Sequence, residues 1–356
     1  MGTQVDCQNC GAGMKFDPET QGLLCDHCGS KRKISDDHRQ AEERDLESAP
    51  FIKNWDPGVQ TFKCESCGAA ISTRKNITGE CPFCGSEYVK ELLQQDDIIS
   101  PSHVIPIRIS QVRAKELFRT WVGRGCFRPN DLKKIKKFEK IMGIYTPFWT
   151  YDCNTHADWT AESGYYYWES QTYTAYVNGK HVRRTRQVRK IRWVPSQGQR
   201  DDRFDDTLIL ASKGINEDIA EKVYPFHLDD LVSYKPEYLS GWMAEEYSID
   251  VHEGWEKAMS KVKMEVHHRC GRDVPGDTYR SLNVRTTFSD MKYKNILLPI
   301  WSASYHYRKK LYRFLINGQT GEVQGEKPVS WIKVGIAVAA GLAAAGLALF
   351  LYLNLS

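Results

Sequence analysis

Eight of the eleven cysteines fall into two matched quartets near the N-terminus, and they constrain the fold of that region more than any other feature. Within each quartet, two C-x-x-C-G motifs are separated by a short segment, of 14 residues in one case and 13 in the other. The first quartet is Cys7, Cys10, Cys25 and Cys28, and the second is Cys64, Cys67, Cys81 and Cys84. Four thiolates complete the closed tetrahedral ligand set of structural zinc. We therefore expect two four-cysteine zinc ribbons, at residues 1–34 and 57–90, with one structural Zn2+ in each.

The two quartets are copies of one repeated unit. Residues 7–12 read CQNCGA and residues 64–69 read CESCGA, while residues 25–30 read CDHCGS and residues 81–86 read CPFCGS. The glycine permits the turn that directs backbone amides toward sulfur. Units of this size bury too little apolar surface to fold alone, and metal binding of roughly 10–16 kcal/mol supplies the difference. Iron, which shares this ligand set, is the minor alternative.

The first residues and the overall composition set the cellular context. Residues 1–10 are polar and lack the apolar stretch of a signal peptide, which favours reduced, metal-binding cysteines over cystines. With 41% hydrophobic and 26% charged residues, the chain has the composition of a folded protein. The formal net charge of +4 does not by itself indicate a nucleic-acid partner.

The C-terminal segment predicts a membrane anchor. Residues 334–353 read VGIAVAAGLAAAGLALFLYL, with no charge and no proline, and a helix of this length spans about 30 Å, the thickness of bilayer hydrocarbon. Lys327 and Lys333 precede it, so the positive-inside rule predicts a single-pass, tail-anchored protein of the cell membrane with a cytoplasmic N-terminus. Small residues at Gly335, Ala339 and Ala343 leave helix self-association open.

Between the ribbons and the anchor (residues 331–356), we expect a charged linker at residues 35–56 and a mostly antiparallel α+β cytoplasmic domain at residues 91–330. The strongest hairpin signal is Asn178-Gly179, between two strand-like runs, and Asn317-Gly318 is another. Apolar periodicity predicts strands over most of residues 145–210, and at 101–109, 281–288 and 297–307. It predicts helices at residues 111–122, 131–142 and 255–268, and a mainly helical segment at residues 216–253 that is broken at Pro225 and Pro236.

Residues 181–192 carry a dense run of positive charge. The side chains are His181, Arg183, Arg184, Arg186, Arg189, Lys190 and Arg192. They would suit the phosphates of nucleic acid or of anionic lipids. The favoured alternative is a solvated strand whose cations pair with the acids of residues 201–206.

Three other features carry weaker signals. The remaining cysteines, Cys126, Cys153 and Cys270, have His156, His267 and His268 as conceivable companions in a third metal site, but isolated cysteines are more often buried as small hydrophobes. The run of aromatic residues at 165–168 is more typical of sheet packing than of a ligand platform. The sequence contains no phosphate-binding G-x-x-x-x-G-K-[ST], no H-E-x-x-H and no G-x-S-x-G motif, so we do not expect an enzyme.

The paired ribbons and several later motifs resemble the bacterial TFIIB-type zinc-ribbon membrane proteins. The resemblance rests on GIYTPFWTYD at residues 143–152, LPIW at residues 298–301 and INGQTGEV at residues 316–323, and it covers most of the chain. Members are often labelled primosomal-helicase-like, yet this sequence lacks helicase nucleotide-binding motifs. Some relatives occur in membrane-stress operons with phage-shock protein A-like and SPFH proteins, which they help hold at the membrane.

These features together predict a membrane-tethered adaptor that recruits protein partners, with SPFH or phage-shock protein A-like proteins as those that the resemblance implies. A membrane-associated nucleic-acid-binding protein that uses the ribbons and the basic strand is the alternative, and an unrecognised enzyme in the α+β domain is the third hypothesis. A zinc ion saturated by four cysteines leaves no open coordination position for catalysis, which favours a binding role.

Overall fold

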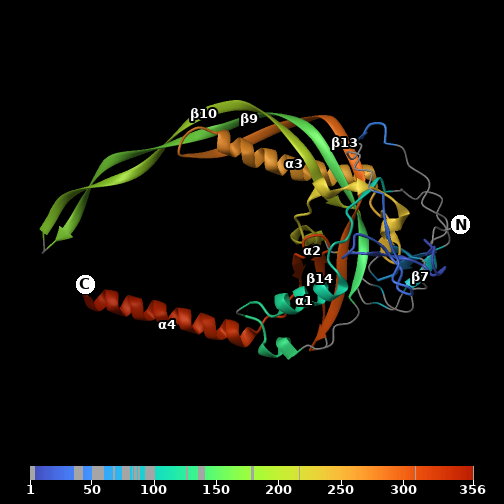
Figure 1. Ribbon diagram of the computed structural model, residues 1–356. Coiled ribbons are helices and arrows are strands. Elements are labelled where there is room, and N and C mark those ends of the chain that lie inside the picture. Colours follow the sequence, from blue (N-terminus) through green and yellow to red (C-terminus); the bar gives the residue numbers. More distant parts are fainter. Residues whose placement is uncertain are drawn as a thin grey trace.

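The computed structural model shows a mostly antiparallel sheet with a few helices, which confirms the α+β class (Figure 1). It describes residues 5–35, 43–49, 60–66, 69–73, 81, 83, 86, 89–92, 101–125, 127–134, 141–177, 180–215, 217–308 and 310–355.

Three long antiparallel strands form the frame of the molecule. In spatial order they are β10 (Lys180–Leu210), β9 (Met142–Val177) and β13 (Thr278–Tyr307), of 31, 36 and 30 residues. The two-residue connection from β9 to β10 confirms the hairpin expected at residues 178–179, although those two residues lie outside the described part. At the body end, β13 turns back into β14 (Lys310–Asn317). Strand β14 then pairs antiparallel with β15 (Val323–Gly325), which confirms the hairpin predicted at Asn317-Gly318.

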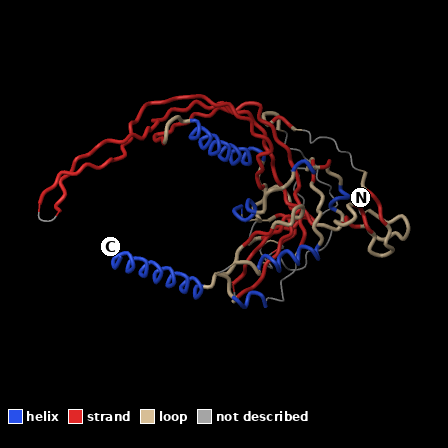
Figure 2. The backbone as a smooth tube through the Cα atoms, turned by 60° about the vertical axis from the view of Figure 1, so that its left-hand side comes forward, coloured by secondary structure: helices blue, strands red, loops and turns tan. Residues whose placement is uncertain are grey.

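The burial of β9 changes along its length because its surroundings change. Residues 143–153 are buried without interruption, as expected for a strand covered on both faces. Residues 153–161 then alternate strictly between buried and exposed, which is the pattern of a strand covered on one face. The strands beside β9 bulge at three places, and each bulge contains a residue with positive φ: Asp206, Ser281 and Asp290. Bulges bend and twist a sheet, so these three account for its strong curvature (Figure 2).

Helix α3 (Val251–Asp273) covers the half-buried part of the long sheet. Asp250 caps its N-terminus by accepting hydrogen bonds from the backbone N–H groups of His252 and Glu253. Its buried side includes Val262, Val266 and Cys270, which pack with Cys153, Ala157 and Trp159 of β9. The helix expected at residues 255–268 is thus confirmed and is longer than predicted.

Helix α1 (Gln111–Val122) confirms another prediction. Ser110 caps it, and its buried Phe118 stacks on Phe314 of β14 with ring centroids 4.0 Å apart. Residues 216–253, predicted to be mainly helical with breaks at Pro225 and Pro236, contain less helix than expected. Only α2 (Glu217–Lys222) is α-helical there, followed by η2 (Leu228–Asp230), β11 (Val232–Ser233), η3 (Pro236–Leu239) and β12 (Met243–Glu245). Pro225 and Pro236 each lack the N–H that a continuing helix needs.

Two further predicted elements are shorter in the structure than expected from the sequence. The helix predicted at residues 131–142 is a 3-10 turn, η1 (Asn130–Lys134), and Met142 already belongs to β9; residues 135–140 lie outside the described part. The strand predicted at residues 101–109 is reduced to β8 (His103–Val104), which pairs in parallel with β13 and antiparallel with β11.

Both cysteine-rich segments are attached to this frame. The first forms a three-stranded sheet, β1 (Lys15–Asp17), β2 (Gly22–Leu24) and β3 (Lys31–Lys33), and the second contains β5 (Gln60–Cys64), β6 (Ala70–Thr73) and β7 (Val89–Leu92). Strand β6 pairs with β12, which in turn pairs with β9, so the second segment extends the main sheet. Within the predicted linker, β4 (Arg44–Asp45) pairs with β13, and Leu46 beside it is buried.

Two elements project from the body on the same side (Figures 1 and 2). One is the far part of the β9–β10 hairpin. The other is α4 (Trp331–Leu355), whose segment Trp331–Tyr352 is long and apolar enough to cross a membrane and has no buried part. At its base, the N–H of Ser330 donates to the carbonyl of Phe127 over 2.7 Å, and Lys333 Nζ lies 2.8 Å from Asn130 Oδ1.

Candidate metal centre

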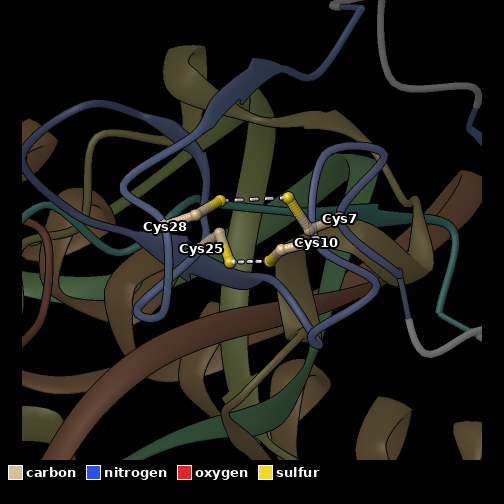
Figure 3. A group of neighbouring side chains, drawn as sticks. All are labelled: Cys7, Cys10, Cys25 and Cys28. Atoms are coloured by element: carbon tan, nitrogen blue, oxygen red, sulfur yellow. Dashed lines mark hydrogen bonds between the residues drawn. The ribbon is translucent and has the colours of Figure 1, made fainter.

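The first cysteine quartet is assembled in space. Cys7 and Cys10 precede β1, and Cys25 and Cys28 follow β2, so the β1–β2 hairpin brings the two pairs together (Figure 3). The Cys7 and Cys28 sulfurs are 3.5 Å apart, as are those of Cys10 and Cys25, and all four lie within 4.8 Å of one another. Sulfurs at about 2.3 Å from a tetrahedral zinc ion are about 3.8 Å apart. The four thiols therefore fit one metal ion.

Each pair of cysteines lies on a tight backbone turn. The Cys7 N–H donates to the Ala12 carbonyl over 2.8 Å, and the Gly11 N–H donates back to the Cys7 carbonyl over the same distance. Around Cys25 the same two bonds are made with Ser30 and Gly29, both at 2.9 Å. Gly11 and Gly29 have φ angles of 72° and 75°, which favour glycine. The glycines of C-x-x-C-G are therefore required by the turn.

Hydrogen bonds to sulfur shape the electrostatics of this quartet. The backbone N–H of Asn9 holds the pKa of Cys7 below its ordinary value, and the Ser30 hydroxyl lowers the pKa of Cys28 to about 6. The pKa of Cys10 is raised to about 12: the backbone N–H of Ala12 opposes the rise, but bonds to neighbouring thiols, foremost Cys28, and burial outweigh it. Without a metal ion, the four thiols therefore differ in their affinity for protons. A cation among them would favour the thiolate form of all four.

The second quartet repeats the turn geometry where the structure describes it. The Cys64 N–H donates to the Ala69 carbonyl over 2.9 Å, and the Cys81 N–H donates to the Ser86 carbonyl over 2.7 Å. Cys67 and Cys84 lie outside the described residues. Both described cysteines are buried, and they pack with the core of the main sheet.

A side-chain hydrogen bond links the two turns in both quartets. In the first, Asn9 Nδ2 donates to Ser30 Oγ over 2.7 Å, and in the second, the hydroxyls of Ser66 and Ser86 are 2.8 Å apart. Asn9 and Ser66 hold the same position of the repeat, as do Ser30 and Ser86. The repeat is therefore structural as well as sequential.

The first cysteine-rich segment also packs closely against the body. Its apolar residues Met14, Phe16 and Leu23 are buried in one core cluster with residues of α1, β9 and β14. The Ser240 hydroxyl donates to the Met14 carbonyl over 2.7 Å, and Trp242 Nε1 donates to the Phe16 carbonyl over 2.9 Å. A metal ion in this quartet would therefore stiffen a surface whose orientation relative to the main sheet is already fixed.

A second group of potential ligands, Glu43, Asp152 and Asp205, gave no signal in the sequence. Asp152 is nearly fully buried, and burial raises its pKa to about 6. The buried Lys294 Nζ lies 3.4 Å from Asp152 Oδ2 and 2.6 Å from Asp206 Oδ1. Burial opposes the charge of Lys294, yet these carboxylates raise its pKa overall. Because Lys294 already supplies a positive charge beside Glu43, Asp152 and Asp206, we interpret these four residues as an internal ion network at a bulge in β10.

The conceivable third metal site is not assembled among the described residues. Cys153 and Cys270 are buried in the core between β9 and α3, as expected of small hydrophobes, and Cys126 lies outside the described part. His156 instead hydrogen-bonds Asp201 over 2.6 Å, which raises the pKa of the imidazole.

The basic strand does not pair with the acids expected for it. Asp202 binds Arg200 and Arg269, and Asp206 binds Lys294. These acids lie toward the body end of the hairpin, far in register from residues 181–192 near its tip. The expectation that the aromatic residues at 165–168 pack within the sheet is also wrong, since Trp168 is 65% exposed and its neighbours Tyr166 and Tyr167 are exposed too.

Comparison with known proteins identifies one relative over nearly the full length. No family model and no solved structure matches the chain. Over 350 residues it is 28% identical to "Uncharacterized protein YdjG" of Bacillus subtilis (strain 168), an alignment that covers 92% of this chain and 91% of that protein. The similarity is therefore not confined to a single motif.

Proposed function

We propose that the chain is a membrane-tethered zinc-ribbon adaptor of the TFIIB-type zinc-ribbon membrane protein class, with no enzymatic activity of its own. The observation that carries this proposal is the pairing of a four-thiol site with an exposed, membrane-length helix in one chain. Four protein ligands leave a zinc ion without an open position, so its role is to stabilise a surface. The helix would hold that surface at the cytoplasmic face of the cell membrane. The small residues along α4 would allow the helices of two copies to pack closely and so to self-associate.

Each quartet would hold one structural zinc ion. The sulfur positions of the first quartet support one ion, and the matching turns at Cys64 and Cys81 support the second. The ribbons dock on the body through backbone and side-chain hydrogen bonds, so a partner bound to them would keep a defined orientation. Protein partners of the SPFH or phage-shock protein A type, in a membrane-stress response, are the partners that the family resemblance suggests.

Affinity purification of the full-length protein from membranes, with partners identified by mass spectrometry, tests the adaptor function. We expect a partner that is lost when Cys10 and Cys28 are both replaced by Ser, although the protein itself stays in the membrane. The control is Glu19→Ala, which changes an exposed side chain of the same ribbon and leaves all thiols in place. Deletion of residues 331–356 should move protein and partner together into the soluble fraction. A partner that is retained by the double cysteine variant would contradict the proposal.

A further inference from the structure

The outer part of the β9–β10 hairpin extends beyond the rest of the sheet. The pairing of β13 with β9 ends at Thr278 and Gly164, so residues 165–177 and 180–192 pair only with each other. We call these two segments the arm. Thirteen residues on each strand give it a length of about 40 Å. Figures 1 and 2 show it curving away from the body, on the side from which α4 also leaves.

Both faces of the arm expose aromatic side chains. Directly opposed residues share a face, so Trp168 lies on one face beside Arg189, and Tyr173 lies on the other beside Arg184. Trp168 and Tyr176 are 65% and 68% exposed, and Tyr167 is 45% exposed. An isolated two-stranded ribbon without a covered face is at best marginally stable in water. Its exposed aromatic side chains and its lack of a covered face therefore indicate that a partner covers the arm.

The charge of the arm is almost entirely positive. The arm contains seven Lys and Arg side chains and a single acid, Glu169, which pairs with Lys190. Among the residues that the structure describes, no carboxylate forms an ion pair with Arg183, Arg184 or Arg189. A surface of this charge is complementary to a dense array of anions.

Tyrosine rings hold several of these guanidinium groups. Arg189 lies 4.3 Å from the centre of the Tyr166 ring, and Arg186 lies 5.4 Å from that of Tyr173. Stacking on a ring orients the guanidinium plane while leaving N–H groups free to bind phosphate oxygens. Interleaved cations and aromatic rings are also what the headgroup region of a bilayer favours, since amphipathic rings are enriched there and cations are drawn to anionic lipids.

We propose that the arm docks on the anionic phosphate headgroups of the bilayer in which α4 is anchored. The inference rests on the proposed membrane tether. An arm that leaves the body on the same side as α4 is kept close to the bilayer, and its seven cations exclude it from the hydrocarbon. The arm therefore lies along the headgroup layer. Helix α4 has no buried part and meets the body at its first turn. The proposal requires that α4 tilts relative to the body so that the arm reaches the headgroups.

Nucleic acid offers the same phosphate chemistry, and a two-stranded ribbon also fits the major groove of DNA. Two observations favour the lipid surface. The anchor supplies headgroups at high local concentration, and aromatic side chains on both faces suit partial burial at an interface better than one-sided contact with a groove. DNA binding is one of the results that the experiment distinguishes.

Amide hydrogen exchange of the full-length protein tests the proposal. The protein is placed in nanodiscs of phosphatidylcholine alone and in nanodiscs with equal parts of phosphatidylcholine and phosphatidylglycerol. We expect exchange over residues 165–192 to slow in the anionic discs only, and to recover at high salt, because salt screens headgroup charge. Exchange in α3 should be the same in both discs and serves as the internal reference.

Charge-neutralising variants make the test specific. Replacing Arg183, Arg184 and Arg186 together by Gln should weaken docking by about 100-fold, since each cation near an anionic surface contributes about fivefold. In the matched control, three exposed cations of the ribbons, Lys31, Lys33 and Lys63, are replaced by Gln instead. The arm should then remain protected from exchange in the anionic discs.

Two results would overturn the inference. One is equal exchange of the arm in both kinds of disc. The other is protection by duplex DNA added to phosphatidylcholine discs, without protection by phosphatidylglycerol. Neither result affects the proposed tether, because failure of the tether is observed separately, as full-length protein that does not enter discs of either composition.

Discussion

Replacement of the buried Glu245 by Gln should make the stability of the protein less dependent on pH. Glu245 lies on β12, beside the β6 strand of the second ribbon, and is fully buried. Its Oε1 accepts a hydrogen bond of 2.6 Å from the Ser212 hydroxyl, whereas its Oε2 has no hydrogen-bond partner among the residues that the structure describes. Burial raises the pKa of this carboxyl from 4.5 to about 8. Glu245 is therefore protonated in the folded protein at neutral pH.

The magnitude follows from the two pKa values. Below about pH 4.5 both the folded and the unfolded chain hold the proton, so the carboxyl has no effect. As the pH rises from 4.5 to 8, only the unfolded chain loses the proton, and the folded state is destabilised progressively. The full cost above pH 8 is about 4–5 kcal/mol, of which about 2 kcal/mol arises between pH 6 and pH 8. Gln carries no titrating proton, so E245Q should be spared this loss.

Urea unfolding followed by tryptophan fluorescence, in detergent and with zinc present, measures both proteins between pH 6 and pH 8. We expect the free energy of unfolding of E245Q minus that of the wild type to increase by about 2 kcal/mol over this range. An unpartnered amide in the variant lowers the free energy of unfolding by the same amount at every pH. The test is therefore the change of the difference between the two proteins with pH. Glu256→Gln, at an exposed position of α3, provides the baseline. A difference that is flat within about 0.5 kcal/mol would refute a buried, protonated Glu245.

Three further predictions concern the metal, the core and the anchor. Elemental analysis of the purified chain should find two zinc ions, and Cys64→Ser should reduce this to one; two ions retained, or mostly iron, would contradict the assignment. Gly254→Ala should lower the urea midpoint by the equivalent of about 1–3 kcal/mol, because an added methyl would collide with the Tyr151 hydroxyl, and an unchanged midpoint would show that this contact yields easily. Protease added outside intact cells should leave residues 1–330 uncut, and cleavage within them would reverse the proposed orientation.

Local signals in the sequence predicted the features that depend on neighbouring residues. The C-x-x-C-G repeats predicted the turns at Cys7 and Cys25, since each turn closes within six residues. Hairpins were found from Asn-Gly pairs, and α1 and α3 from apolar periodicity. In each case the physical cause lies within about one turn of chain, where sequence reasoning is strongest.

The features that were missed depend on contacts between distant segments. The buried Lys294 network joins Glu43, just before β4, with β9, β10 and β13, and its bulge residue Asp206 resembles any exposed acid in the sequence. Docking of the first ribbon depends on a bond between Met14 and Ser240, 226 residues apart. The aromatic residues at 165–168 have the high β propensity of a packed sheet, but this propensity does not reveal whether a neighbouring layer is present.

The continuity of β9 links the proposed metal sites to the proposed membrane contact. Near its start, Ile144 and Tyr145 pair with β12, the strand that joins the second ribbon to the sheet, and its other end forms the arm. All three bulges lie in the flanking strands, so β9 itself runs without an inserted residue for 36 residues, a contour of about 120 Å. A sheet bends by its bulges and resists stretching through its hydrogen bonds. A partner on the ribbons would therefore stand at a fixed distance from the headgroups that the arm contacts, which a flexible tether could not provide.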